Sequence, residues 1–385
     1  MWWKRSDIQL TKSELISVNN LTGYVLPHAG TTYTGSILSH SLRFKPTNFF
    51  DKILIIYYPS QLTKNVKTKK KRYYHEYYVV KKSVSYVCRN YWNYGKKTYV
   101  HWNVRDKQQL SVSLDLSKTL VIVSADFSHH LDLQQAISLE NCAAKSLVNR
   151  YLSSLPCQDV LDHKLSFQRL FHLLPKTNQL QWIGRTRSPG KKGVGYLSFL
   201  IRDISAEPLS IPDGFFVTSY DNQMNTRECL GDWLSSNHEY NNKKVAKKVK
   251  ELVKEVYNCS ITSSRLTGGQ HISIPVTHYT ITYLFKEPMN TPVIRGWHGV
   301  KYDAFYLPSV LLENVYDNGT WIRSSDTKWP QDTQFRIEST LQKLQQKARQ
   351  SKDMIINLDK LHCYSTKQTC HKFSSKLTNS YDNNL

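Results

Sequence analysis

Three apolar runs in the first two hundred residues each end in polar side chains. They occupy residues 21–26, 53–58 and 120–123. The third run, LVIV, is continuous rather than alternating, and three of its four residues are β-branched. This pattern is typical of a strand buried on both faces of a parallel sheet. Each run therefore predicts a strand followed by a loop with polar side chains.

The neighbouring stretches predict helices and one more strand. Residues 133–155 repeat apolar side chains at helical spacing, and residues 194–201 form another apolar run after the turn-forming sequence SPGKKG. Alternating strands and helices predict an α/β domain with a mostly parallel sheet flanked by helices. Ligands bind outside the carboxyl ends of such strands, where Asp126 and His129 follow the 120–123 run. An aspartate in this place is also an ordinary turn or N-cap residue.

The pattern changes after a polar stretch at residues 203–214, whose two prolines and one glycine are typical of a linker. The segment that follows lacks βαβ regularity and predicts an α+β domain. We expect a strand at 215–220, an amphipathic helix at 242–257, strands at 272–285, a glycine-bearing loop at 295–300 and a final helix near 335–349.

These boundaries predict three regions. We expect an α/β domain over residues 1–204, a smaller α+β domain over residues 205–350, and a polar, disordered tail over residues 351–385. The tail contains two cysteines and two histidines, which are residue types that bind zinc. They are His362, Cys363, Cys370 and His371.

The chain is strongly basic, with 52 Lys and Arg against 30 Asp and Glu and a formal net charge of +22. Basic side chains attract nucleic acid by releasing counterions from phosphates, and the run KNVKTKKKR at 64–72, followed by tyrosines, suits contact with a single strand. An AT-rich coding sequence also produces this abundance of Asn, Lys, Tyr and Ile. We expect a solvated basic loop at 64–72 and only non-specific electrostatic binding of nucleic acid.

The sequence also indicates a compartment. No apolar run approaches the length needed to span a bilayer, and the start, MWWKRSDIQL, is unlike a secretory leader. Seven scattered cysteines without CxxC pairs argue against a complete disulfide framework. We expect an intracellular, cytoplasmic protein without a membrane association.

Two of the loops resemble a known family. LPHAGTTYTGS at 26–36 and VSADFSHH at 123–130, in this order, resemble the signatures of the Memo-like family. Segments at 159–175 and 194–200 are placed like the late helix and closing strand of that family. The resemblance covers roughly residues 20–202. It implies the fold of class III extradiol-type dioxygenases, with a metal-binding pocket at the strand ends.

The second half resembles the AMMECR domain. The similarity rests on DGFFVTSYDNQMNTRECLGDW at 213–233, GWHGVKYDAFYLPSV at 296–310 and IESTLQKLQQKA at 337–348. Arg227, Cys229 and Gly231 match the arginine, cysteine and second glycine of the family's motif, which makes them candidate cofactor-binding residues, whereas Glu228 replaces its first glycine. Fusions or neighbours of these two domains form the AmmeMemoRadiSam system, which implies a radical SAM protein as a partner.

The resemblance also implies a set of metal ligands. His28 matches the histidine of the PHAG signature, and Asp126 and His129 match the aspartate and histidine of the second loop. Two imidazoles and one carboxylate suit iron most, with manganese, copper and zinc as alternatives. His75 and Glu76 match a segment that carries histidine and glutamate in the family.

The chain departs from the family at two ligand positions. Gln61 stands where the family has a histidine, and Asp162, with His163 beside it, stands where many members have a cysteine. A neutral amide is a poor ligand, so the predicted site has lost its softest donors. Asp162 or His163 is the candidate for a fourth ligand or a general base.

Two functions follow from these observations. The first is a metal-dependent enzyme that performs redox or hydrolytic chemistry in the strand-end pocket. The second is a catalytically inactive two-domain binding or scaffold protein, which recognises a small molecule or peptide and keeps the fold but not the metal site.

Overall fold

In the computed structural model the chain forms two compact units. The described residues are 2–59, 66–67, 72–105, 114–150, 152, 164–190, 192–203, 211–221, 226–234, 241–262, 276–286, 298–302 and 361–373. The first unit contains a six-stranded sheet and the second a five-stranded sheet.

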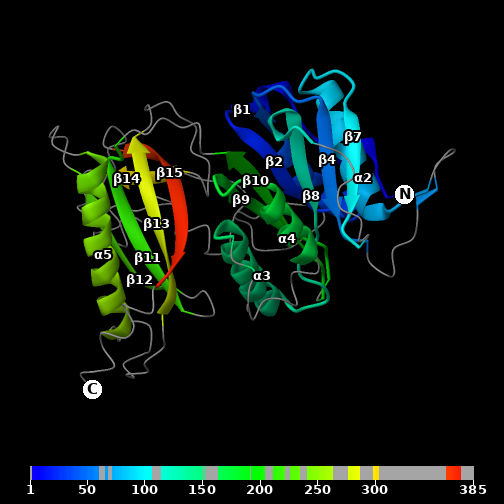
Figure 1. Ribbon diagram of the computed structural model, residues 1–385. Coiled ribbons are helices and arrows are strands. Elements are labelled where there is room, and N and C mark those ends of the chain that lie inside the picture. Colours follow the sequence, from blue (N-terminus) through cyan, green and yellow to red (C-terminus); the bar gives the residue numbers. More distant parts are fainter. Residues whose placement is uncertain are drawn as a thin grey trace, which may run out of the picture. The chain divides into compact units, whose positions relative to one another are not determined.

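The six-stranded sheet has the order β7-β4-β8-β2-β10-β9 (Figure 1). Its parallel strands are β2 (Leu21–Leu26), β4 (Lys52–Tyr57), β7 (Thr98–Asn103) and β8 (Thr119–Ser124). Two antiparallel strands extend one edge, β10 (Gly195–Asp203) and β9 (Asn178–Arg187). All six residues of β8 are buried. The mostly parallel sheet and the buried strand at 120–123 are therefore confirmed.

Four helices pack against this sheet. They are α1 (Thr31–Leu42), α2 (His75–Asn90), α3 (Leu133–Val148) and α4 (Lys164–Leu173). Helices α1 and α2 contact each other, α3 contacts β9 and β10, and α4 contacts β4 and β8. The helix expected over 133–155 ends at Val148, shortly before Arg150, whose φ of 53° is left-handed and does not continue a helix.

Short elements complete the first unit. Strand β1 (Ile16–Val18) pairs in parallel with β3 (Phe44–Pro46), and β5 (Val66–Lys67) pairs antiparallel with β6 (Arg72–Tyr73). The 3₁₀ turns are Arg5–Asp7, Lys12–Glu14 and Leu116–Lys118. Residues 66–67 and 72 of the expected basic loop thus belong to short paired strands, and the rest of that run lies outside the described residues.

The second unit is built on an antiparallel sheet in the order β12-β11-β13-β15-β14. Its strands are β11 (Gly214–Asp221), β12 (Thr226–Trp233), β13 (Val276–Lys286), β14 (His298–Tyr302) and β15 (Leu361–Lys372). Helix α5 (Asn242–Thr262) contacts β11, β12 and β13. Its valine stripe packs on Phe215, Val217 and Ile281, which confirms the amphipathic helix.

Two expectations about this unit are wrong. Residues 361–372 of the expected disordered tail form β15, which pairs with β13 on one side and with β14 on the other. The strand needs no apolar run, because alternate positions suffice to bury one face, and Tyr364 and Thr366 are the buried ones. The loop expected at 295–300 is already a strand from His298 onward. The helix expected near 335–349 lies outside the described residues.

The position of β15 also removes the zinc site suggested by the cysteines near the carboxyl end. Cys363 and Cys370 belong to one strand that pairs with β13 without a register shift. Seven residues of extended chain separate their backbones by about 23 Å. The two cysteines of one chain therefore cannot bind the same ion.

Candidate functional site

The register between β2 and β8 brings two predicted site residues together. Leu26 is paired with Ser124 in these parallel strands, and His28 and Asp126 each follow two residues later. The backbone N–H of His28 donates to Asp126 Oδ1 at 2.8 Å, and His28 Nε2 lies 3.6 Å from Asp126 Oδ2. Both side chains are buried. A carboxylate and an imidazole thus meet at the carboxyl ends of the sheet, where ligands bind in α/β folds.

The hydrogen bonds of Ser124 determine the tautomer of His28. Ser124 Oγ donates to the carbonyl oxygen of Glu76 at 2.7 Å and lies 3.1 Å from His28 Nδ1. Because the hydroxyl hydrogen is already used, Nδ1 must be the donor in the second contact. In a neutral ring the lone pair then belongs to Nε2, which lies beside Asp126 Oδ2. A lone pair and a carboxylate repel each other unless a positive charge lies between or upon them.

These side chains line a cavity of about 420 Å³. His75 and Glu76, the first residues of α2, are buried in its wall. His129, from the loop after β8, also lines the cavity and is half-buried. The lining consists of Trp2, His28, Ala29, Gly30, Tyr33, His75, Glu76, Asp126, His129, Ser188, Pro189, Val194 and Tyr196. No lysine or arginine is among these described lining residues, although the chain carries a net charge of +22.

Aromatic rings form part of the cavity wall. Trp2 and Tyr33 are exposed, at 49% and 45%, and the Trp2 and His75 rings lie 4.3 Å apart between centroids. Trp2 is held there because its carbonyl oxygen accepts the N–H of Thr31, in the first turn of α1, at 3.1 Å. Tyr196 is buried, and burial together with the charge of Asp126 raises the pKa of its phenol. The Tyr196 hydroxyl therefore remains protonated and can donate a hydrogen bond to a ligand.

His75 is the clearest sign that the cavity accommodates a polar partner. Its Nε2 is buried and has no hydrogen-bond partner among the described residues. Burial lowers the pKa of the His75 imidazole, against the opposing effect of Asp126. A buried polar atom without a partner is costly, so a bound ligand or water is expected to satisfy it.

His28 and Asp126 fit a metal ion both in the chemistry of their donor atoms and in the distance between them. A histidine ligand usually donates its other ring N–H to a neighbouring acceptor, as His28 does to Ser124. The 3.6 Å between His28 Nε2 and Asp126 Oδ2 suits two ligands of one ion that are each about 2.1 Å from it. Within the part of the chain that the structure describes, no three His, Cys, Asp or Glu groups converge as a metal site. Water or a ligand would have to complete the coordination.

The remaining predicted residues belong to two groups. Gln61, Asp162 and His163 lie outside the described residues. In the second unit, Arg227, Cys229 and Gly231 belong to β12, the edge strand. A register shift at Arg227 interrupts the alternation of side chains along this strand, so alternation places only Cys229 and Gly231 on one face of the sheet. Arg227 is buried, and Cys229 Sγ accepts a hydrogen bond from Thr218 Oγ1 at 3.2 Å. Their role in cofactor binding stays a prediction.

Sequence reasoning missed the aromatic wall of the cavity. Trp2 and Tyr196 are distant from both signatures in the sequence, and Tyr33 lies inside the first signature without an assigned role. Contacts with Thr31, such as those of the Trp2 carbonyl oxygen and the Lys4 N–H, bring the start of the chain to the cavity. No spacing rule for motifs encodes such a contact.

Comparison with models of known protein families and with curated proteins finds no match for this chain. Within the described residues, no helix is long and apolar enough to cross a membrane.

Proposed function

We propose that the cavity of the first unit binds a positive charge between His28 and Asp126, and that this charge is a divalent metal ion. The observation that carries the proposal is the pairing of His28 Nε2 with Asp126 Oδ2 at 3.6 Å while Nδ1 donates to Ser124. Iron(II) and manganese(II) are the preferred ions, because imidazole and carboxylate donors suit them. The resemblance to Memo-like proteins agrees with this choice.

The residues around the pair have distinct tasks in such a site. Ser124 fixes the tautomer of His28, and the backbone N–H of His28 orients Asp126. A bound ion would supply Lewis acidity, lowering the pKa of a water molecule or polarising a ligand oxygen. Burial favours the neutral form of His75, whereas Tyr196 stays protonated and can donate a hydrogen bond. This combination supports hydrolytic or redox chemistry on a small ligand.

The test is a manganese(II) titration and elemental analysis of protein purified without a metal-affinity tag. We expect about one site per chain in the wild type, as for a single His28–Asp126 pair. His28→Ala and Asp126→Asn should weaken binding by more than the roughly 10–100-fold typical of losing an outer partner of a metal ligand. His172→Ala, on the exposed face of α4, is the control and should bind as the wild type does.

A second candidate is an organic cation. Three aromatic side chains, Trp2, Tyr33 and Tyr196, line the cavity with two carboxylates and no lysine or arginine among the described lining. Aromatic faces and carboxylates together recognise ammonium groups. Quenching of tryptophan fluorescence by tetramethylammonium, with no effect of manganese, would favour this candidate over the metal. If neither cation binds, the proposal is wrong and the inactive binding or scaffold protein remains.

We extend the proposal to the second unit, as an AMMECR-type domain that acts with a radical SAM protein. Support comes from the resemblance and from the single strand, β12, that carries Arg227, Cys229 and Gly231. Co-expression with a radical SAM protein from the same organism tests the partner. A complex that survives size-exclusion chromatography and is lost in Arg227→Ala is expected, and its absence would contradict the assignment.

A further inference from the structure

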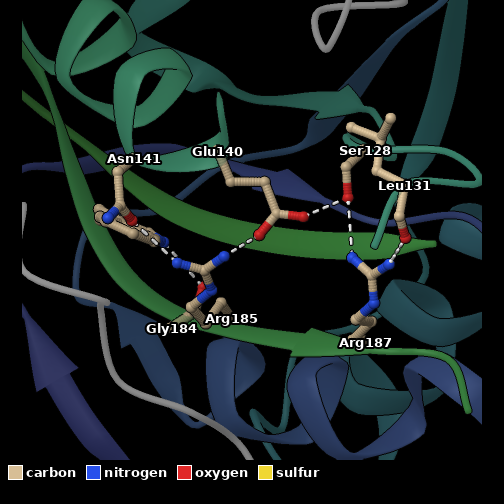
Figure 2. A network of polar contacts seen from close by, with 8 residues as sticks. Ser128, Leu131, Glu140, Asn141, Gly184, Arg185 and Arg187 are labelled. Carbon is tan, nitrogen blue, oxygen red and sulfur yellow. Dashed lines mark hydrogen bonds and ion pairs between the residues drawn. The ribbon is translucent and has the colours of Figure 1, made fainter. Parts of the chain in front are cut away.

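A buried network of charged side chains lies directly behind the loop that carries His129 (Figure 2). Ser128 Oγ donates to Glu140 Oε1, and Glu140 Oε2 forms an ion pair with Arg185 Nη2. Arg187 Nη1 donates to Ser128 Oγ at 3.3 Å. All four side chains are at most 2% exposed. Burying three charges is costly unless they are paired, so this network needs a structural or functional explanation.

Arg187 also holds the loop further along the chain. Its Nη2 donates to the carbonyl oxygen of Leu131 (Figure 2). His130, which directly precedes Leu131, has a φ of 57°. Residues other than glycine rarely adopt this left-handed conformation. Such a conformation persists only when the surroundings enforce it. Arg187 supplies this restraint by bonding on both sides of the His129–His130 pair.

The backbone of β10 provides a third attachment. The N–H of Phe127 donates to the carbonyl oxygen of Gly195 at 2.9 Å, and the N–H of Gly195 donates to that of Ser128 at 2.8 Å. Position 195 must be glycine for this approach, because a Cβ there would overlap the carboxylate of Glu140. The loop before His129 is thus attached to β10 through the backbone, at a position where the Glu140 carboxylate leaves no room for a side chain.

We propose that Arg187 and Ser128, supported by the Glu140–Arg185 ion pair, are positioning residues that orient His129 toward the cavity. His129 lines the cavity beside His28 and Asp126, so the purpose of orienting it rests on the proposed function. The geometry itself is independent of what the cavity binds. The network acts on His129 through the backbone and has no contact with the ligand.

The test compares two variants at the loop with one on the far side of the same network. Arg187→Lys keeps the charge but loses the planar fork that reaches both Ser128 and Leu131, and Ser128→Ala removes the bridging hydroxyl. Asn141→Ala is the matched control, because Asn141 Oδ1 accepts from Arg185 Nη1 at 2.9 Å without touching the loop (Figure 2). Two properties are measured for each protein: manganese(II) affinity, and the imidazole ¹⁵N shifts of His129 without metal, identified by a His129→Gln variant.

We expect both loop variants to shift the His129 imidazole signals. They should also lower manganese affinity by about 10–100-fold, the range for lost support of a metal ligand, because the same loop carries Asp126. Asn141→Ala should change neither, even if it lowers the melting temperature. The proposal is overturned if all three variants leave His129 signals unchanged, or if Asn141→Ala shifts them as much as Arg187→Lys. If the wild type binds no manganese, the proposed metal function fails, while the imidazole signals still test the positioning role.

Discussion

A side chain at position 195 would occupy space that Glu140 and Ser128 already fill. A Cβ on Gly195 would overlap Glu140 Oε1 and lie 2.6 Å from Ser128 Oγ. Both neighbours are buried and hydrogen-bonded to each other, so neither can move without breaking the network. We expect Gly195→Ala to lower the free energy of unfolding by about 1–3 kcal/mol, the usual cost of overpacking. Chemical denaturation measures this change.

The control for this prediction is Gly95→Ala. A Cβ at Gly95 has no atom within 4 Å among those the structure describes, so the free energy of unfolding should change by less than about 1 kcal/mol. Equal losses in the two variants would show that the close approach at Gly195 does not matter for stability.

His40 gives the stability a dependence on pH. It is partly buried, with Nε2 3.2 Å from the carbonyl oxygen of Ile183, and burial together with the charge of Arg43 lowers its pKa to about 3. Below pH 6.5 the unfolded chain therefore binds a proton at His40 that the folded chain does not bind until about pH 3. Stability should fall as the pH falls through this window, by at most about 1.4 kcal/mol per pH unit for this residue.

Urea denaturation at several pH values tests the contribution of His40. The slope of unfolding free energy against pH should be shallower between pH 6.5 and 3 in His40→Gln than in the wild type. His172→Gln, at an exposed position of α4, serves as the control and should keep the wild-type slope. An unchanged slope in His40→Gln would mean that the His40 imidazole already titrates in the folded state as it does in the unfolded chain.

The sequence predicts the meeting of His28 and Asp126 because each residue directly follows a strand, and parallel strands end at one edge of the sheet. It does not predict Trp2, whose place depends on a backbone contact with Thr31. It also does not predict Arg187, which lies in β9 and reaches the loop after β8 only once β10 has folded between β2 and β9. Long-range pairings of this kind leave no periodic pattern in the sequence.

Strand β15 illustrates the same limit for whole elements. Runs with strong periodicity, such as the valine stripe of α5 and the apolar run of β8, were predicted correctly. The sequence LHCYSTKQTCHK is polar and lies between stretches of similar composition, so local pattern favours a tail. Its strand form comes from partners on both sides, β13 and β14. Main-chain hydrogen bonds to these neighbours do not depend on apolar side chains.

Ser365 tests whether β15 is an interior strand. It pairs with Phe285 of β13 and with His298 of β14, so its N–H faces one partner strand or the other. Ser365→Pro removes this donor and should destabilise the second unit by roughly 1–3 kcal/mol or more. Ser365→Val keeps the donor and suits a strand. Protection of the β13 amides from hydrogen exchange should fall in the proline variant and persist in the valine variant. Equal protection in both would contradict the pairing.

The net charge of +22 belongs to the molecule as a whole and not to its cavity, whose described lining contains no lysine or arginine. Single-stranded DNA should therefore bind without sequence preference, and lose about 10³–10⁵ in affinity between 50 and 200 mM salt if six to ten phosphates are contacted. Fluorescence anisotropy across this salt range measures the loss, and Asp126→Asn should bind DNA as the wild type does. Manganese bound between the buried side chains of His28 and Asp126 should respond far less to salt, because burial reduces screening. Salt-resistant DNA binding, or competition between DNA and manganese, would instead place nucleic acid at the cavity and contradict the separation of charge and site.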